Sequence, residues 1–285
     1  FDSPIPTDYG VPINDTTKFT DGELTGPLDK GTYTVAMAFS RNYFIKGQTY
    51  PDANSATYDF GLNTTTLSKR EVVGVGNCNA CHIDFRMHEG KFRTPDICIT
   101  CHTSGAEDMN STDMADPTPQ TIDFKVMVHK LHNGAHLPSV QGLTTAADGS
   151  RVYGTGTPYV VGTKDFSGVN FPSFPNARIA MPKDTGYSAL SAANKTKDDN
   201  VRKGVTSCFN CHGDPDGMGP LAAPAQGNNA YAEPGKASCG SCHDDLDYAK
   251  PYVVNGFSMP ANAPENQCKV CHVEQGTMFS VRDSH

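Results

Sequence analysis

Residues 126–137 read Val-Met-Val-His-Lys-Leu-His-Asn-Gly-Ala-His-Leu, and the rest of the chain is organised around this stretch. It supplies three histidines, His129, His132 and His136, that belong to no cysteine motif. All ten cysteines of the 285-residue chain fall in five Cys-x-x-Cys-His motifs, which are Cys78–His82, Cys98–His102, Cys208–His212, Cys239–His243 and Cys268–His272. Cys-x-x-Cys-His is the attachment sequence for c-type haem. The sequence therefore predicts five covalently bound haem c groups.

Each motif predicts how one haem is held. Two cysteines bond to one porphyrin edge, and the following histidine reaches the iron when the motif forms a short helical turn. The predicted attachment residues are Cys78, Cys81, Cys98, Cys101, Cys208, Cys211, Cys239, Cys242, Cys268 and Cys271, and the predicted first axial ligands are His82, His102, His212, His243 and His272. The five remaining histidines are His88, His129, His132, His136 and His285. Because neutral imidazole is a favoured haem ligand, the matched numbers predict bis-histidine ligation of all five irons.

Two other uses of Cys-x-x-Cys compete with haem attachment. Zinc ribbons take such pairs two at a time, so an odd number of five would leave one over. A disulfide framework would not require a histidine after every second cysteine. Both alternatives explain the pattern less well than haem.

Composition fits a chain wrapped around cofactors. Hydrophobic residues make up 37% of the chain and tryptophan is absent, whereas glycine and proline are frequent at 27 and 20 residues. We therefore expect a mostly irregular multihaem c-type cytochrome with short helices. The net charge of −8 disfavours nucleic acid and anionic lipid as partners and favours cationic patches and metal ions.

The compartment follows from the haems and from the start of the chain. Haem c is attached outside the cytoplasm, and the chain begins Phe1-Asp2-Ser3, so we expect a removed signal peptide. No run of about 18 apolar residues is present, which predicts no membrane span. We expect an extracellular or cell-surface protein, with the periplasm as second choice.

Residues 1–70 predict an N-terminal arm followed by a small β module. Tyr33, Val35, Met37 and Phe39 alternate with small or polar residues, which is typical of a half-buried strand. Further strands are expected at 43–45 and 58–62, separated by Gly47 and by turn material at 51–54. The module is short for a sandwich, so we expect its edges to need a partner.

Residues 71–285 predict the pentahaem domain. A helix is expected to start near Thr118 and Pro119, with Asp123 at its positive end and Asn133-Gly134 as its stop. Its apolar stripe leaves His129 and His132 together on one flank, and His136 on the following loop. Residues 151–162 are expected to pair as a hairpin around Gly154-Thr155-Gly156.

The distal ligands of the last three motifs are harder to assign. No histidine lies between His243 and His272. These ligands must come from the central helix, from His88 or from His285, and methionines remain as substitutes that would raise the reduction potential. The candidates are Met218, Met259 and Met278, with Met87 a weaker alternative to His88.

Several segments resemble the pentahaem module of the outer-membrane decahaem cytochromes of the OmcA/MtrC family. They are residues 71–73, 78–82, 88–93, 128–134, 165–167, 238–245 and 283–285. The resemblance implies that the histidines matching His88, His129, His132 and His285 are distal haem ligands. It also implies electron transfer across the cell surface to minerals, flavins or electrodes. This chain departs from the family by having one pentahaem module and no histidine between its last two motifs, for which His136 is the replacement.

Two classes of function remain open. An electron conduit needs only closely spaced, six-coordinate haems. A multihaem reductase of a small oxyanion needs an iron with an open position, often signalled by lysine in place of the motif histidine, and none of the five motifs shows it. We therefore expect an electron-transfer protein rather than an enzyme. Its expected partners are other copies of itself in a filament, or other cytochromes and extracellular acceptors, with a monomeric shuttle as the alternative.

Overall fold

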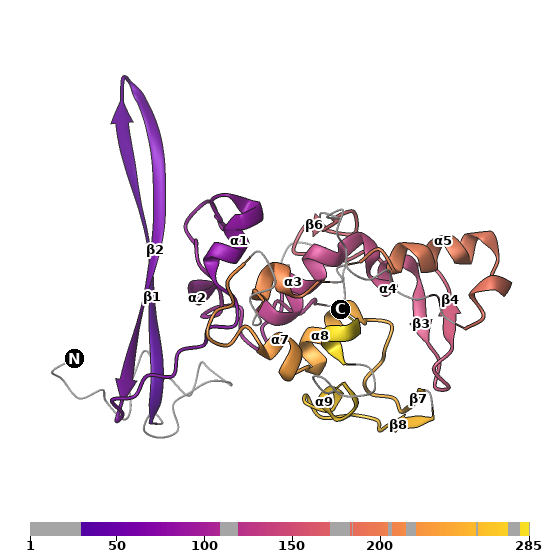
Figure 1. Ribbon diagram of the computed structural model, residues 1–285. Coiled ribbons are helices and arrows are strands. Elements are labelled where there is room, and N and C mark those ends of the chain that lie inside the picture. Colours follow the sequence, from indigo (N-terminus) through magenta and orange to yellow (C-terminus); the bar gives the residue numbers. More distant parts are fainter. Residues whose placement is uncertain are drawn as a thin grey trace, which may run out of the picture. The chain divides into compact units, whose positions relative to one another are not determined.

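The computed structural model describes residues 30–108, 119–171, 183, 185–204, 207–214, 221–254, 256–272 and 280–284. The chain divides into two compact units, residues 1–70 and 71–285 (Figure 1). Each is described by itself below.

The first unit contains one long antiparallel hairpin. Strand β1, Gly31–Ile45, pairs with strand β2, Gln48–Leu62, in an unbroken register from Gly31–Leu62 to Ile45–Gln48. Lys46 and Gly47 connect the strands, and both have positive φ, of 50° and 81°. Positive φ at both central residues is the requirement of a type I′ turn, which matches the twist of the flanking strands.

The expected turn at residues 51–54 was wrong. Pro51 to Asn54 lie inside β2 and pair with Phe39 to Asn42 of β1. Proline is tolerated because a two-stranded ribbon has only edge strands, where a missing N–H can face solvent. The expectation of a half-buried strand was also wrong, since Val35, Met37 and Phe39 are exposed within β1.

The second unit contains short helices joined by long loops, as expected for a cofactor-rich chain (Figure 1). The α-helices are α1 Val75–His82, α2 Pro95–Cys98, α3 Phe124–Asn133, α4 Pro138–Gln141, α5 Ala192–Val201, α6 Phe209–His212, α7 Asn229–Ala232, α8 Lys236–Cys242, α9 Cys268–Cys271 and α10 Val281–Ser284. Short 3-10 turns are η1 Gly134–His136 and η2 Tyr187–Ala189. None of the helices among the described residues is long and apolar enough to cross a bilayer.

The described residues of this unit also form three two-stranded sheets. They pair β3 Leu143–Thr145 with β4 Arg151–Tyr153, β5 Val160–Val161 with β6 Lys164–Asp165, and β7 Tyr252–Val254 with β8 Phe257–Met259. The expected hairpin within 151–162 was therefore wrong, because its two halves pair with different partners. Gly156 packs so tightly that a Cβ there would lie 1.9 Å from the Val140 carbonyl oxygen, so this glycine serves close packing rather than a turn.

Helix α3 begins five residues later than Pro119. Asp123 is its N-cap, and its carboxylate accepts a hydrogen bond from the Lys125 amide at 3.0 Å. The segment before it is held in extended form, because Glu107 and Thr121 form a β-bridge and Asp108 accepts a bond from the Gln120 amide at 2.5 Å. Thr118 lies outside the described residues. The expected end at Asn133-Gly134 is confirmed.

The apolar core is small. Few large hydrophobic residues are buried in the described part of the chain. They are Ile97, Leu137, Leu143, Tyr159, Tyr231, Tyr252 and Val281. Leu137 and Leu143, which flank α4, are almost completely enclosed. The described residues therefore form little apolar core for a unit of this length.

Candidate functional site

Every Cys-x-x-Cys-His motif forms a single helical turn. The amide of the motif histidine donates to the carbonyl of the first cysteine at 2.9 Å for His102, His243 and His272, and at 3.0 Å for His212. The first motif lies within α1. This turn brings the two thiols and the imidazole to one side of the backbone, as haem attachment needs. All ten cysteines lie among the described residues, and none of them is in a disulfide bond.

Three motif histidines each face one histidine from outside the motifs. The ring centroids are 6.1 Å apart for His82 and His132, 5.9 Å for His88 and His102, and 6.2 Å for His129 and His212. A metal–nitrogen bond is about 2 Å long, and a ring nitrogen lies about 1 Å from its centroid, so two imidazoles on opposite sides of one iron have centroids about 6 Å apart. Each pair therefore has the ring separation expected of two imidazoles that bind one metal ion.

Backbone hydrogen bonds set the tautomer of four imidazoles, three of which belong to these pairs. The Nδ1–H groups of His102, His132, His136 and His212 donate to the carbonyls of Ile122, Val128, Asn200 and Val72, at 2.9, 2.8, 2.7 and 3.2 Å. A carbonyl can only accept, so the proton must be on Nδ1 and the Nε2 lone pair is free. An imidazole fixed in this way is prepared to bind iron through Nε2.

Burial keeps several of these rings neutral. It lowers the pKa of His129 to about 4, helped by the neighbouring His212, while the Lys125 carbonyl one turn earlier acts in the opposite direction. Burial also lowers the pKa of His212, His136 and His243. Since iron binds the neutral imidazole, these environments favour the ligand form.

Phenylalanine rings pack against the imidazoles of the first two pairs. Phe85 meets His82 edge-on at 5.5 Å, Phe171 meets His132 at 5.9 Å, and Phe92 meets His88 at 5.2 Å. These contacts fix the planes of the rings. Sequence reasoning missed these phenylalanines. Phe85 and Phe92 nevertheless lie within four residues of the histidines they contact, which is a usable signal.

His88 reaches its partner through an unusual backbone. His88, Glu89 and Gly90 all have positive φ, of 50°, 61° and 83°. The strands on either side of this turn meet in the Met87–Phe92 bridge. Non-glycine residues rarely adopt positive φ, so the left-handed turn holds His88 at a definite place beside His102 rather than on a free loop.

Helix α3 is fastened to the fourth motif by charge. Lys130 of α3 donates to Asp244 at 2.8 Å, and Asp244 also accepts from the amide and hydroxyl of Ser139 at 2.9 and 2.5 Å. Asp245 accepts from the Thr145 hydroxyl at 2.5 Å. Lys130 and Asp244 are mostly buried, so removing either one would leave the other as an uncompensated charge in the interior. It fixes α8 beside the helix that carries His129 and His132.

A second buried carboxylate holds the helix that orients His136. Asp198 of α5 is 1% exposed and accepts from Arg151 Nη1 at 3.2 Å, from the Tyr153 hydroxyl at 3.3 Å and from Arg202. These bonds anchor α5 against β4. Asn200 of the same helix supplies the carbonyl that accepts from His136. Asp244 lies in one of the segments that carry the family resemblance, whereas Asp198 is an acidic residue in a polar segment and carried no sequence signal.

The surroundings of the fourth and fifth motifs differ from those of the first three. The fourth and fifth motif histidines are close enough that His272 lowers the pKa of His243. No ring pair is formed by His136 with either of them within the described part of the chain, and His285 lies outside it. Met218 and Met278 are likewise outside. Among the described residues, no group of three or more His, Cys, Asp or Glu side chains lies close enough together to hold a metal ion.

Comparison with known proteins adds a family. Residues 70–285 match the family model described as outer membrane cytochrome MtrC/MtrF-like, domains II/IV. The crystal structure of MtrC from Shewanella baltica OS185 is 20% identical over 88% of this chain, with a TM-score of 0.42. The present chain covers 28% of the length of that MtrC chain. No curated protein matches the chain.

Proposed function

The chain belongs to the outer membrane cytochrome MtrC/MtrF-like family, domains II/IV, and from this we propose that it conducts electrons outside the cell through five covalently attached haem c groups. Such haems accept and donate single electrons at iron, while the polypeptide sets their spacing and surroundings. Each motif supplies two thioether sulfurs and one imidazole.

The observation that carries this proposal is the set of three facing imidazole pairs. Ring separations of 5.9 to 6.2 Å in three independent places match the separation that two axial ligands of one iron require. In this proposal His132 is the distal ligand at the first motif, His88 at the second and His129 at the third. His136 and His285 then remain for the fourth and fifth motifs.

This ligand set favours conduction over catalysis. Two imidazoles on one iron would leave no open position for a substrate, so this ligand set would support electron transfer rather than the binding of an oxyanion. The three histidines from outside the motifs come from two segments: His88 lies in a tight turn, and His129 and His132 lie on α3. Helix α3 thus contributes ligands to two haems and brings them close together.

Haem quantitation combined with EPR of the fully oxidised protein tests the proposal. We expect five haems per chain, all low-spin. A haem count of four or fewer would contradict the cofactor set, and a high-spin ferric signal in the intact protein would instead support a reductase with an open iron.

We further propose that the protein works at the cell surface or beyond it, exchanging electrons with other cytochromes or with mineral and electrode surfaces. In the more specific form of this proposal, copies of the chain join into an extracellular haem filament. Electron microscopy of the native protein tests it. Fibres would support the filament, whereas monodisperse particles of about 30 kDa at every concentration would support the monomeric shuttle.

A further inference from the structure

The hairpin of β1 and β2 has one strongly apolar face. Directly paired residues of an antiparallel ribbon share a face, and the faces alternate along each strand. The register places Tyr33, Val35, Met37, Phe39, Arg41, Tyr43 and Ile45 on one face, with Phe60, Tyr58, Ala56, Asn54, Asp52, Tyr50 and Gln48 opposite them. The other face carries mainly threonine, serine and alanine, together with Asn42, Phe44, Pro51 and Asp59.

This apolar face is exposed. Met37 is 62% exposed, Phe39 51% and Tyr58 71%, and Val35, Tyr43, Ile45 and Tyr50 are exposed as well. Strands of 15 residues are more than twice the usual length, and an isolated two-stranded hairpin is marginally stable in water. A contiguous apolar surface on such a ribbon is typical of an interface.

The outer edge of β2 is less suited to pairing than the face. The two-residue turn makes Ile45 and Gln48 a hydrogen-bonded pair, and alternation from there makes Asn42 and Pro51 a non-hydrogen-bonded pair. The nitrogen of Pro51 therefore points to the outer edge, where it cannot donate. A proline at this position is a common obstacle to strand addition.

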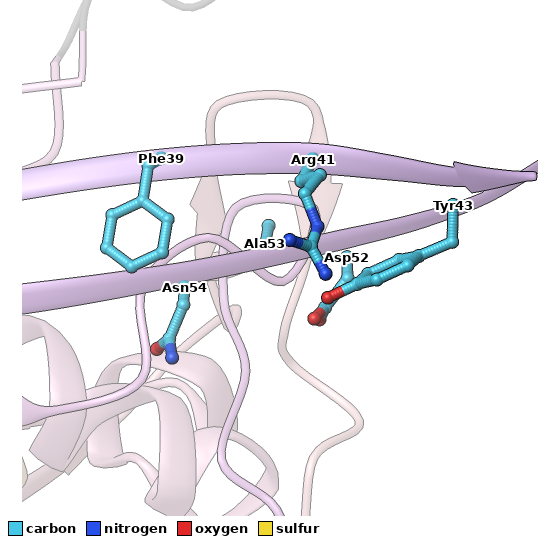
Figure 2. Close-up of a pocket in the computed structure, with 6 residues that line it drawn as sticks. All are labelled: Phe39, Arg41, Tyr43, Asp52, Ala53 and Asn54. Carbon is cyan, nitrogen blue, oxygen red and sulfur yellow. The ribbon is translucent and has the colours of Figure 1, made fainter.

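The charged residues on the apolar face indicate which kind of partner would cover it. Its only charged residues are Arg41 and Asp52, which are directly paired across the strands. They lie at a shallow hollow of about 370 Å³ lined also by Phe39, Tyr43, Ala53 and Asn54 (Figure 2). The Arg41 guanidinium lies 4.0 Å from the centre of the Tyr43 ring. One cation and one anion side by side make the face complementary to itself.

We infer that two copies of this chain associate face to face through this surface, related by a two-fold axis parallel to the strands. That axis places β1 of one copy over β2 of the other, so each Arg41 meets the other copy's Asp52 and Tyr43 meets Tyr50. A two-fold axis running across the strands through this pair would instead stack like charges. This choice of axis is therefore imposed by the charges.

The size of the surface suits a dimer. A ribbon of 15 residues is about 50 Å long and about 10 Å wide, so two such faces bury on the order of 1,000 Å², the size from which specific interfaces begin. Because a two-fold contact closes on itself, it gives a dimer. This inference rests on the proposed filament, because the dimer contact would be one of the two contacts that join its subunits. A filament also needs a second, different contact between dimers.

Charge reversal on the holoprotein tests this interface, with mass measured by light scattering across a range of concentrations. We expect the native chain to be dimeric, and Arg41→Glu and Asp52→Arg each to weaken association at least about tenfold, because each puts like charges together. Ser40→Glu, on the opposite face of β1, is the matched control and should leave the dimer unchanged.

Mixing the two charge variants separates a contact between copies from one within a hairpin. In the mixed pair, the glutamate introduced at position 41 of one copy faces the arginine introduced at position 52 of the other, and the unchanged Asp52 and Arg41 also face each other. Equimolar Arg41→Glu and Asp52→Arg should therefore re-form a dimer that neither forms alone. A native chain that stays monomeric, or a mixture that stays monomeric, overturns the inference.

The same variants distinguish the dimer face from the proposed filament. Dimers without fibres would support the inferred dimer interface and contradict the proposed filament. Fibres that persist in Arg41→Glu would contradict the face and support the filament.

Discussion

At the scale of single residues, each facing pair joins a motif histidine to one distant histidine, so the two members should act as a unit. Removing either His88 or His102 should cost one low-spin iron, and removing both should cost the same one. Combining His102→Ala with His132→Ala should cost two, because those histidines face different partners. EPR spin counting with haem quantitation measures this.

The control for this experiment is Lys125→Ala, which changes the first turn of α3 without touching an imidazole. It should retain the full low-spin signal. Loss of two irons in the His88–His102 double variant would contradict the pairing, and so would a failure of added imidazole to restore the low-spin signal of His88→Ala.

Ring orientation predicts a difference between the three irons that the proposed function places in these pairs. The planes of His82 and His132 are 84° apart, whereas those of His88 and His102 are 35° apart and those of His129 and His212 are 27° apart. Near-parallel imidazoles split two iron d orbitals, and perpendicular ones leave them almost equal in energy. We therefore expect the iron between His82 and His132 to give the most anisotropic low-spin EPR signal, and His132→Ala to abolish that signal selectively. Loss of a rhombic signal instead would contradict this.

The buried His129 predicts resistance to acid. Its pKa is lowered to about 4 by burial, below the ordinary 6.5, so protons are taken up more readily by any state in which the ring is exposed. Between pH 6.5 and about 4 the native, neutral form is retained at growing cost, and it is lost below about 4. The low-spin signal of this iron should therefore persist to lower pH than it would with an exposed histidine as the ligand.

A matched control replaces the buried His129 side chain by free imidazole from solution. In His129→Ala supplied with imidazole, the ligand is protonated in solution, so low-spin character should disappear at a clearly higher pH. Equal acid midpoints for the two samples, followed by EPR or magnetic circular dichroism, would show that burial does not protect the ligand.

At the scale of elements, Asp198 predicts how α5 is held. Asp198→Ala would leave Arg151 and Arg202 without their shared carboxylate in a buried site, and we expect a loss of about 3–5 kcal/mol in the free energy of unfolding. Urea denaturation measures it. The neighbouring Asp199 is the control: its side chain is 42% exposed, so Asp199→Ala should cost far less. Similar losses for both would contradict a special role for Asp198.

Some features of the helices and strands could be predicted from the sequence and others could not. The apolar stripe and the Asn133-Gly134 stop predicted α3, because both are local signals, but its start was placed too early because Gln120 and Thr121 are held by Glu107 and Asp108. Which histidine faces which motif was not predictable, since His129 meets a motif 83 residues away through tertiary packing. The hairpin strands were predicted by alternation, yet their exposed faces depend on what covers them.

At the scale of the whole molecule, charge governs which small redox partners approach. The chain has 31 acidic against 23 basic residues, and each proposed haem adds two propionates, so the protein is strongly anionic in either oxidation state. Potentials of one sign raise the local concentration of oppositely charged partners and the rate of encounter. A cationic cobalt or ruthenium complex should therefore oxidise the reduced protein faster than an anionic iron complex of similar driving force.

Salt dependence separates this electrostatic effect from differences in chemical reactivity between the two oxidants. Raising ionic strength from about 10 mM to about 1 M shortens the screening length from about 30 Å to about 3 Å. The rate with the cationic oxidant should then fall, and the rate with the anionic oxidant should rise, until the two converge. Stopped-flow absorbance of the haem bands follows both reactions. Rates that are independent of salt for both oxidants would show that electrons leave through a locally neutral surface, where the net charge of the chain has no influence.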